Sequence, residues 1–306
     1  MKSIQFFMLV TNRDAYIASY AIKSYNLVVS VLKNYDWKLT VYLNCIKQNF
    51  KDTIVNDWRK YNYVEIIDNE MFVNKNNFIP GTSYSKDGGY VYITANAEPY
   101  DEIWTREFRN FKTDYWVTVD ADFEILKPDF IVSAFKMLEN DNNLAVISSD
   151  FSENTYTFDS YSKEYILAMK RYHTWFCIYK NISKICNTPH YYYKEEYYGV
   201  RLSFDSACKF QYDLRDKYGY SMKAVDKKYY SSYIHYGQFS NNSSLDTLKK
   251  INRYRKTAIL AYKGIFGNNW IIDKIIKKIF LYIHNYLYKN FKKELGKYNY
   301  NSELDK

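Results

Sequence analysis

The sequence lacks several features that mark other classes of protein. No run approaches the ~20 consecutive apolar residues of a membrane-spanning helix, which argues against an integral membrane protein. The four cysteines show neither a Cys-x-x-Cys pair nor a metal-ligand spacing, so we expect inert thiols in a cytosolic protein. Only four prolines are present, no Pro-rich linker occurs, and we find no internal repeat. The apolar start has no small-residue cleavage site after it, which favours a first strand over a signal peptide.

Positive charge is concentrated in one segment. The net charge is +9, yet the segment from Thr247 to Lys293 alone holds twelve Lys or Arg and a single acid, Asp273. Because the rest of the chain is close to neutral, a nucleic-acid-binding body is a poor explanation of the basic pI. At 306 residues and 47% hydrophobic composition, the chain can form a full core, as one large domain or as one domain with an appendage.

Strand-like and helix-like segments alternate along most of the chain. Strands are predicted at residues 4–10, 38–44, 63–67, 115–120, 144–148, 222–226 and 233–237. Helices are predicted at about 14–34, 50–60, 99–112 and 128–138, and from residue 205 onward. Residues 150–204 are aromatic and irregular, and they give no clear assignment. The alternation predicts an α/β fold with a mostly parallel sheet flanked by helices.

The most informative stretch runs from Tyr115 to Phe123. A β-prone apolar run leads directly into two carboxylates, Asp120 and Asp122, separated by one small residue. Carboxylate oxygens are the ligands that a hard divalent cation prefers, and such an ion also binds phosphates. In parallel sheets, ligands bind at the carboxyl ends of the strands, where this pair and the segment Thr11-Asn12-Arg13 are both expected. The alternative is a solvated acid pair in a turn.

With this layout, the chain resembles glycosyltransferases of the GT-A fold, of the broad family-2 type, from about residue 3 to residue 240. The resemblance rests on five short motifs in the family's order: Thr11-Asn12-Arg13; Ala21-Ile22-Lys23-Ser24; Arg106 with Lys112-Thr113-Asp114-Tyr115; Phe204-Asp205-Ser206 with Gly219-Tyr220; and Ile234-His235-Tyr236-Gly237. One departure is the second strand, which ends in Asn44-Cys45 where the family has an acid that contacts the nucleotide base. Asp68 is the candidate for part of that role.

The resemblance implies a role for each matched residue. Mn²⁺ or Mg²⁺ would be bound by Asp120, Asp122 and His235, with Glu124 as a substitute if the strand continues. A nucleoside-diphosphate sugar would be contacted by Thr11, Asn12, Arg13, Asp68, Arg106, Asp120 and Ala121. Asp205 is the candidate general base of an inverting transfer, for which Glu195 and Glu196 compete. His173 and His190 are candidates for the acceptor groove, although ordinary packing explains both more simply.

The basic segment predicts an amphipathic helix. From Trp270 onward, apolar residues recur every three or four positions, and lysines mostly occupy the other side. Such a helix can lie in the interface of an anionic membrane, which places the protein in the cytoplasm, peripheral to the inner face of the membrane. The alternative is docking on its own domain or on a second subunit in a homo-oligomer. We therefore predict a catalytic domain at 1–245, with a nucleotide-binding half at 1–122 and an acceptor half at 123–245, followed by a helical extension at 246–306.

Together these features predict a metal-dependent glycosyltransferase that moves a sugar to a hydroxyl of a glycan or lipid-linked glycan, in bacterial surface polysaccharide or glycoconjugate synthesis. No nucleic acid is expected as a partner. One alternative is a metal-dependent nucleotidyltransferase, although no Gly-rich or basic signature follows the first strand. A second alternative is an inactive membrane-surface scaffold of the same fold.

Overall fold

The computed structural model describes most of the first 236 residues and isolated positions beyond them. The described residues are 1–11, 15–44, 46, 48, 51–69, 100–152, 155–159, 164–168, 171–188, 193–197, 200–204, 207–236, 256, 260, 275, 278–280, 282, 283 and 286. Among them, no helix combines the length and apolarity that crossing a bilayer requires.

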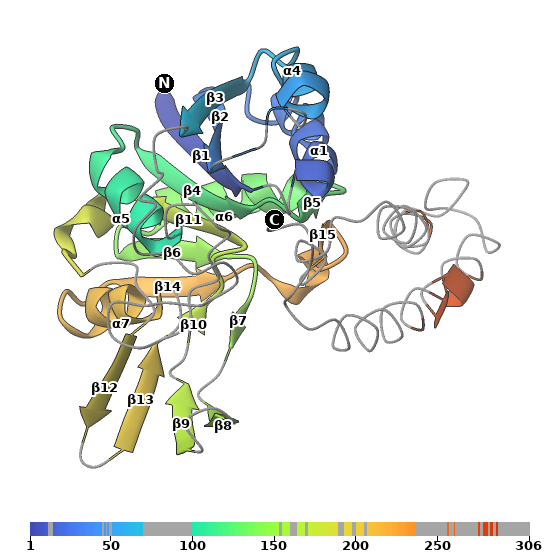
Figure 1. The fold of residues 1–306 in the computed structure, drawn as a ribbon. Coiled ribbons are helices and arrows are strands. Elements are labelled where there is room, and N and C mark those ends of the chain that lie inside the picture. The colour runs from blue at the N-terminus through green and yellow to red at the C-terminus, as the bar shows by residue number, and fades with distance from the viewer. Residues whose placement is uncertain are drawn as a thin grey trace.

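A seven-stranded sheet forms the centre of the protein (Figure 1). Its strands, in spatial order, are β14 (Ser221–Ala224), β6 (Leu144–Ser148), β11 (Phe176–Lys180), β4 (Tyr115–Asp120), β1 (Lys2–Val10), β2 (Tyr35–Asn44) and β3 (Val64–Asn69). All neighbouring pairs are parallel except the two that involve β11. The predicted α/β class and mostly parallel sheet are therefore confirmed, and β11 makes the sheet mixed.

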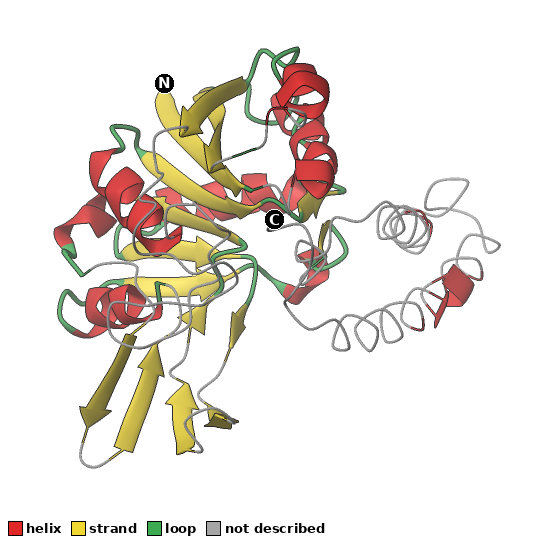
Figure 2. Cartoon of the chain, in the orientation of Figure 1, coloured by secondary structure: helices red, strands yellow, loops and turns green. Residues whose placement is uncertain are grey.

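Helices pack on both faces of this sheet (Figure 2). One buried cluster joins α1 (Ala15–Ser24), α2 (Asn26–Val29) and α6 (Asp129–Asn140) to one face, and a second joins α5 (Tyr100–Asn110) and α7 (Cys208–Asp216) to the other. The crossover between β2 and β3 contains a π-helical turn, η1 (Lys51–Val55), and α4 (Asn56–Trp58), while η2 (Asn181–Ile185) and η3 (Lys227–Tyr229) are 3₁₀ turns. Two apolar layers on a central sheet explain why the strands read as nearly continuous hydrophobic runs.

The single helix predicted from residue 14 to about residue 34 is two shorter helices in the structure. α1 ends at Ser24, Tyr25 interrupts the helix, and α2 runs only from Asn26 to Val29. The Ser24 hydroxyl donates to the Ala21 carbonyl at 2.6 Å. A serine that bonds back onto its own helix competes with the backbone ladder, which bends or ends helices. The same hydroxyl accepts the Ile125 amide at 3.0 Å, so the interruption ties α1 to the segment after Asp122. The predicted apolar stripe is nevertheless buried.

In the region left unassigned between residues 150 and 204, the described residues form seven strands. β11 completes the central sheet, and β7 (Phe151–Ser152) pairs with β10 (Arg171–Tyr172). Another four, β8 (Thr155–Asp159), β9 (Glu164–Ala168), β12 (Tyr193–Tyr197) and β13 (Val200–Phe204), form a separate sheet that extends away from the core (Figure 1).

Finally, β5 (Phe123–Ile125) pairs with β15 (Tyr233–His235) in a two-stranded ribbon. This ribbon carries the chain back to the end of β4.

Candidate metal-binding site

Three side chains with metal-binding atoms converge at the carboxyl end of β4. Asp120 is the last residue of β4, Asp122 follows two residues later, and His235 is the last residue of β15. His235 Nε2 lies 3.3 Å from Asp120 Oδ2 and 3.1 Å from Asp122 Oδ1. One ligand atom from each of the three residues lies within 4.8 Å of the others. The grouping expected from the sequence is present, and metal binding by it stays a prediction.

Local pairing explains why these distant residues meet. The Asp120 amide donates to the Trp175 carbonyl at 2.8 Å, and the chain then turns through buried Ala121. In the ribbon, His235 is paired with Phe123, and the Tyr236 amide donates to the Asp122 carbonyl at 3.0 Å. Phe123 also stacks on Tyr233 at 4.9 Å, which anchors the ribbon in the core. Backbone hydrogen bonds and apolar packing therefore bring the imidazole to the two carboxylates.

The charges of the three groups are coupled. Burial lowers the pKa of His235, but the nearby carboxylates of Asp122 and Asp120 raise it by more. The pKa of His235 is therefore raised to about 10. Burial raises the pKa of Asp122, and His235 partly offsets this increase. In the metal-free protein, the raised pKa of His235 favours an imidazolium beside the two carboxylates. A divalent cation would displace this proton, because a ligating histidine must be neutral.

The donor set fits Mn²⁺ or Mg²⁺. Two carboxylates and one imidazole suit these ions, which usually keep several coordination positions for water or substrate phosphates. The side chain of Asp122 is 5% exposed and that of Asp120 is 30% exposed, so the site is accessible from the side of Asp120. Three protein ligands on an open edge could hold an ion that also binds a diphosphate.

Glu124 does not join the cluster as predicted. The expected alternation of Asp120, Asp122 and Glu124 requires one continuous strand, but β4 ends at Asp120 and β5 belongs to a different sheet. Glu124 is 3% exposed, and its carboxylate accepts a hydrogen bond from the Tyr236 hydroxyl. Among the described residues, the candidate metal cluster does not include it.

Arg106 lies on the same face of the sheet as Asp120. Its guanidinium donates to the Tyr42 hydroxyl at 2.9 Å, and it lies over the Tyr42 ring at 5.8 Å. Tyr42 is in register with Leu9, and Leu9 with Asp120, so the three residues form one row across β2, β1 and β4. At the usual strand spacing, Tyr42 and Asp120 are roughly 10 Å apart at their Cα atoms. The Arg106 guanidinium is thus hydrogen-bonded to a residue of the row that ends at Asp120.

Asp68 and Thr11 have other surroundings. Asp68 is in register with Leu43, one residue out of step with the Tyr42 row, and it forms an ion pair with Lys51 at 2.7 Å. It therefore points to the other face of the sheet and lies on its outermost strand, apart from the metal cluster. Thr11 is buried, and its carbonyl accepts the Ala15 amide at the start of α1.

Several other predicted residues give no test of the site. Asn12, Arg13, His190 and Asp205 lie outside the described residues. Glu195 and Glu196 lie on β12, in the sheet that extends away from the core. The carboxylate that would act as the general base therefore stays a prediction.

Trp175 also contacts the cluster, although its sequence context does not predict this. Its indole stacks on the His235 imidazole at 4.1 Å, and its carbonyl holds the Asp120 amide. The only signal is positional: Trp175 precedes the buried run of β11, whose antiparallel register puts residue 175 opposite residue 120. That register is unknown until β11 is assigned to the central sheet.

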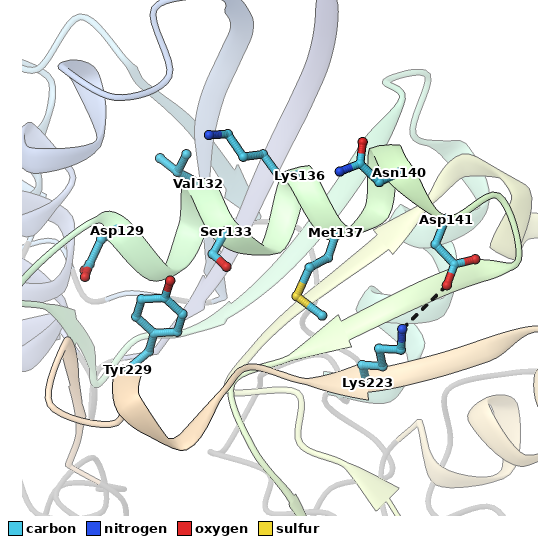
Figure 3. Close-up of a pocket in the computed structure, with 9 residues that line it drawn as sticks. All are labelled: Asp129, Val132, Ser133, Lys136, Met137, Asn140, Asp141, Lys223 and Tyr229. Carbon is cyan, nitrogen blue, oxygen red and sulfur yellow. Dashed lines mark ion pairs between the residues drawn. The ribbon is translucent and has the colours of Figure 1, made fainter.

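A cavity of about 490 Å³ lies elsewhere, between α6, β14 and η3 (Figure 3). Asp129, Lys136, Lys223 and Tyr229 are among the residues that line it, and Lys223 is paired with Asp141 at 3.5 Å. None of the three candidate metal ligands lines this cavity. It is therefore separate from the chemistry proposed for the end of β4.

No family model matches the chain, and no curated protein matches its sequence. The chain is similar to several solved structures. Glucosyl-3-phosphoglycerate synthase from Mycobacterium tuberculosis, in complex with Mn²⁺ and UDP-glucose, is 13% identical with a TM-score of 0.42 over 86% of this chain and 80% of that chain. Mannosyltransferase PcManGT from Pyrobaculum calidifontis, in complex with GDP-Man and Mn²⁺, is 11% identical with a TM-score of 0.43 over 93% and 69%.

A third structure, 4-diphosphocytidyl-2C-methyl-D-erythritolsynthase from Anaerococcus prevotii, is 9% identical with a TM-score of 0.44 over 83% and 99% of the two chains. At these identities and TM-scores, none of the three decides which reaction this chain performs.

Proposed function

We propose that this protein is a metal-dependent glycosyltransferase that uses a nucleoside-diphosphate sugar as donor. The observation that carries the proposal is the convergence of Asp120, Asp122 and His235 at the carboxyl end of a central parallel strand. This edge is where open α/β sheets bind their ligands. The oxygen-rich donor set there suits a cation that binds diphosphate.

Each residue of the proposed site has a definite task in this reaction. Asp122, which is buried, and Asp120, at the open edge, hold Mn²⁺ or Mg²⁺ together with His235. The bound ion would offset charge that develops on the leaving nucleoside diphosphate. Arg106, held by Tyr42, supplies a guanidinium suited to phosphate oxygens. Asp205 is proposed to take the proton from the acceptor hydroxyl as it attacks the anomeric carbon.

We further propose a glycan or lipid-linked glycan as acceptor, in bacterial surface polysaccharide or glycoconjugate synthesis. The support is the basic segment from Thr247 to Lys293. Within it, the described side chains of Ile275, Ile279, Tyr282 and Tyr286 recur at helical spacing and are 53 to 76% exposed. Exposed apolar residues among many lysines favour attachment to an anionic membrane surface, which would bring the enzyme to a lipid-linked acceptor.

A donor screen tests the main proposal. Purified protein is incubated with a panel of nucleotide sugars, with Mn²⁺ or with EDTA, and release of nucleoside diphosphate is measured. Release that depends on both the metal and one donor supports the proposal. Pyrophosphate release from nucleoside triphosphates would indicate a nucleotidyltransferase instead, and absence of turnover across the panel would favour an inactive scaffold.

Vesicle sedimentation tests the membrane attachment separately. The full chain should pellet with vesicles that contain anionic lipid, and added salt should weaken the binding because exposed charges are screened. A chain truncated after Thr257 should stay in the supernatant and keep its donor hydrolysis. Sedimentation of the truncated chain would contradict the proposal, and dimerisation of the full chain without vesicle binding would indicate docking on a second subunit.

A further inference from the structure

Three aromatic rings form a stack that ends at the candidate metal site. The Trp175 indole lies 4.1 Å from the His235 imidazole at an interplanar angle of 23°. It also lies 4.1 Å from the His173 imidazole at 15°. The indole is thus in close, nearly parallel contact with a candidate metal ligand and with a second histidine.

The second histidine is fixed by two hydrogen bonds. Arg171 lies 2.8 Å from His173 Nδ1, and Ser152 Oγ lies 2.7 Å from His173 Nε2. A guanidinium can only donate, so Nδ1 must accept, and the proton of the neutral ring is on Nε2. His173 therefore donates to Ser152 and cannot act as its base, which excludes a serine nucleophile here. In this orientation, the ring stacks on the indole of Trp175.

The backbone around the stack is also anchored. The Thr118 hydroxyl donates to the Thr174 carbonyl at 2.8 Å, and the Ser148 hydroxyl donates to the His173 carbonyl at 2.6 Å. The Trp175 carbonyl accepts the Asp120 amide. Side chains of β4 and β6 thus fix the segment from which the indole projects.

His235 is held in an unusual way for a metal ligand. A ligating histidine almost always donates its second ring nitrogen to a carbonyl, carboxylate or water, which fixes the ring plane. Both contacts of His235 to carboxylates use Nε2, and no described residue forms a hydrogen bond with its Nδ1. The indole is the described group that restrains the plane of the imidazole.

We propose that Trp175 is a positioning residue for His235, orienting the imidazole toward the cation by ring stacking. This inference rests on the proposed function, because it assumes a metal at Asp120, Asp122 and His235. A ring already held in its binding orientation loses less freedom when the ion binds, so the affinity is higher. Through its carbonyl and its indole, Trp175 contacts one ligand from β4 and one from β15.

The test measures Mn²⁺ affinity of the full chain by electron paramagnetic resonance, without substrate. Trp175→Leu should weaken Mn²⁺ binding by about 10-fold or more, in the range seen when outer-shell partners of metal ligands are removed. Trp175→Phe keeps a stacking ring and should recover most of the affinity. Unchanged affinity in Trp175→Leu, or no recovery in Trp175→Phe, would overturn the inference.

Trp37 provides a matched control. It is also partly buried against the same core and stacks on Tyr63 at 5.3 Å, far from the ligands on the other side of β1. Trp37→Leu should lower the thermal midpoint while leaving Mn²⁺ affinity unchanged. If it weakens Mn²⁺ binding as much as Trp175→Leu, the loss reflects general destabilisation and the inference fails.

A double-mutant cycle separates this inference from the proposed function. If Trp175 acts only through His235, Trp175→Leu should cause no further loss of Mn²⁺ affinity in a His235→Ala background. Additive losses would contradict a role through His235. If His235→Ala alone leaves Mn²⁺ affinity unchanged, the metal site itself is wrong. If His235→Ala weakens binding and Trp175→Leu does not, only the positioning role is wrong.

Discussion

Asp122 and Asp120 differ in exposure, and this difference should be visible in metal binding. Asp122 is nearly buried beside His235, whereas Asp120 is at the open edge. Charge interactions are stronger where solvent is excluded. Asp122→Asn should therefore reduce Mn²⁺ affinity by at least about 100-fold, at or above the upper end of outer-shell effects. Asp120→Asn should also weaken binding, but less.

Isothermal titration with Mn²⁺ measures both losses. Asp141→Asn is the control, because Asp141 forms a surface ion pair with Lys223 away from the cluster. Full Mn²⁺ affinity in Asp122→Asn would remove the basis of the proposed function.

Gly219 has a backbone conformation that other residues adopt at a cost. Its φ is +75°, its amide bonds to the Arg215 carbonyl at 3.0 Å after α7 ends, and a Cβ there would meet no atom within 4 Å. Gly219→Ala should destabilise the protein by about 1 kcal/mol through backbone strain alone. Gly219→Asn should cost less, because asparagine tolerates this region better. Urea unfolding measures both, and equal stability of Ala and Gly would contradict the assignment.

At the scale of single residues, the sequence predicts the members of the cluster better than it predicts the residues around them. Asp120 and Asp122 follow an apolar run directly, so their place at a strand end can be read locally. The position of His235 came from a family resemblance rather than from local pattern. Trp175 and Glu124 could not be placed, because one depends on the register of β11 and the other on the end of β4.

Among the elements, α5 offers a test of nucleotide binding. Arg106 on this helix faces Tyr42 in the row of Asp120, whereas Arg109 donates to the Asn187 carbonyl. Arg106→Ala should weaken binding of a nucleoside diphosphate by roughly 10- to 100-fold, the loss expected for a charged hydrogen bond. Arg109→Ala on the same helix should leave this affinity unchanged. Equal effects of the two variants in a nucleotide titration would refute the role of Arg106.

The boundaries of helices and strands can be predicted where burial of an apolar pattern alone determines them. The strand at Leu144–Ser148 and the helix after Pro128 were recognised because their apolar patterns match their burial. The interruption at Tyr25 was not, since it arises from a serine that bonds both its own helix and Ile125. β11 was missed because its short buried run lies within an aromatic region without periodicity.

For the molecule as a whole, metal binding should raise thermal stability. A ligand that binds only the folded state at 100 times its dissociation constant adds about 2.7 kcal/mol. In a protein of this size, that gain should raise the thermal midpoint by on the order of 5 °C. Differential scanning calorimetry with Mn²⁺ and nucleoside diphosphate measures the shift, and EDTA should reverse it. An Asp120→Asn/Asp122→Asn variant should show no shift, and an equal shift in that variant would place the ion elsewhere.

The overall architecture could be inferred from alternating strands and helices, since each parallel pair needs a crossover that covers one face. The four-stranded sheet could not, because the parallel pairing that joins its two local strand pairs, β8 with β9 and β12 with β13, brings together β9 and β13, which are far apart in sequence. The parallel frame was thus predicted, and the added sheet was found only in the structure.

The pairing of β5 with β15 also has a consequence for biosynthesis. Asp120 and Asp122 are synthesised long before His235. While residue 235 is still inside the ribosome, a nascent chain therefore carries the two carboxylates without the imidazole. The three-residue site can therefore be completed only after β15 has been made and has paired with β5.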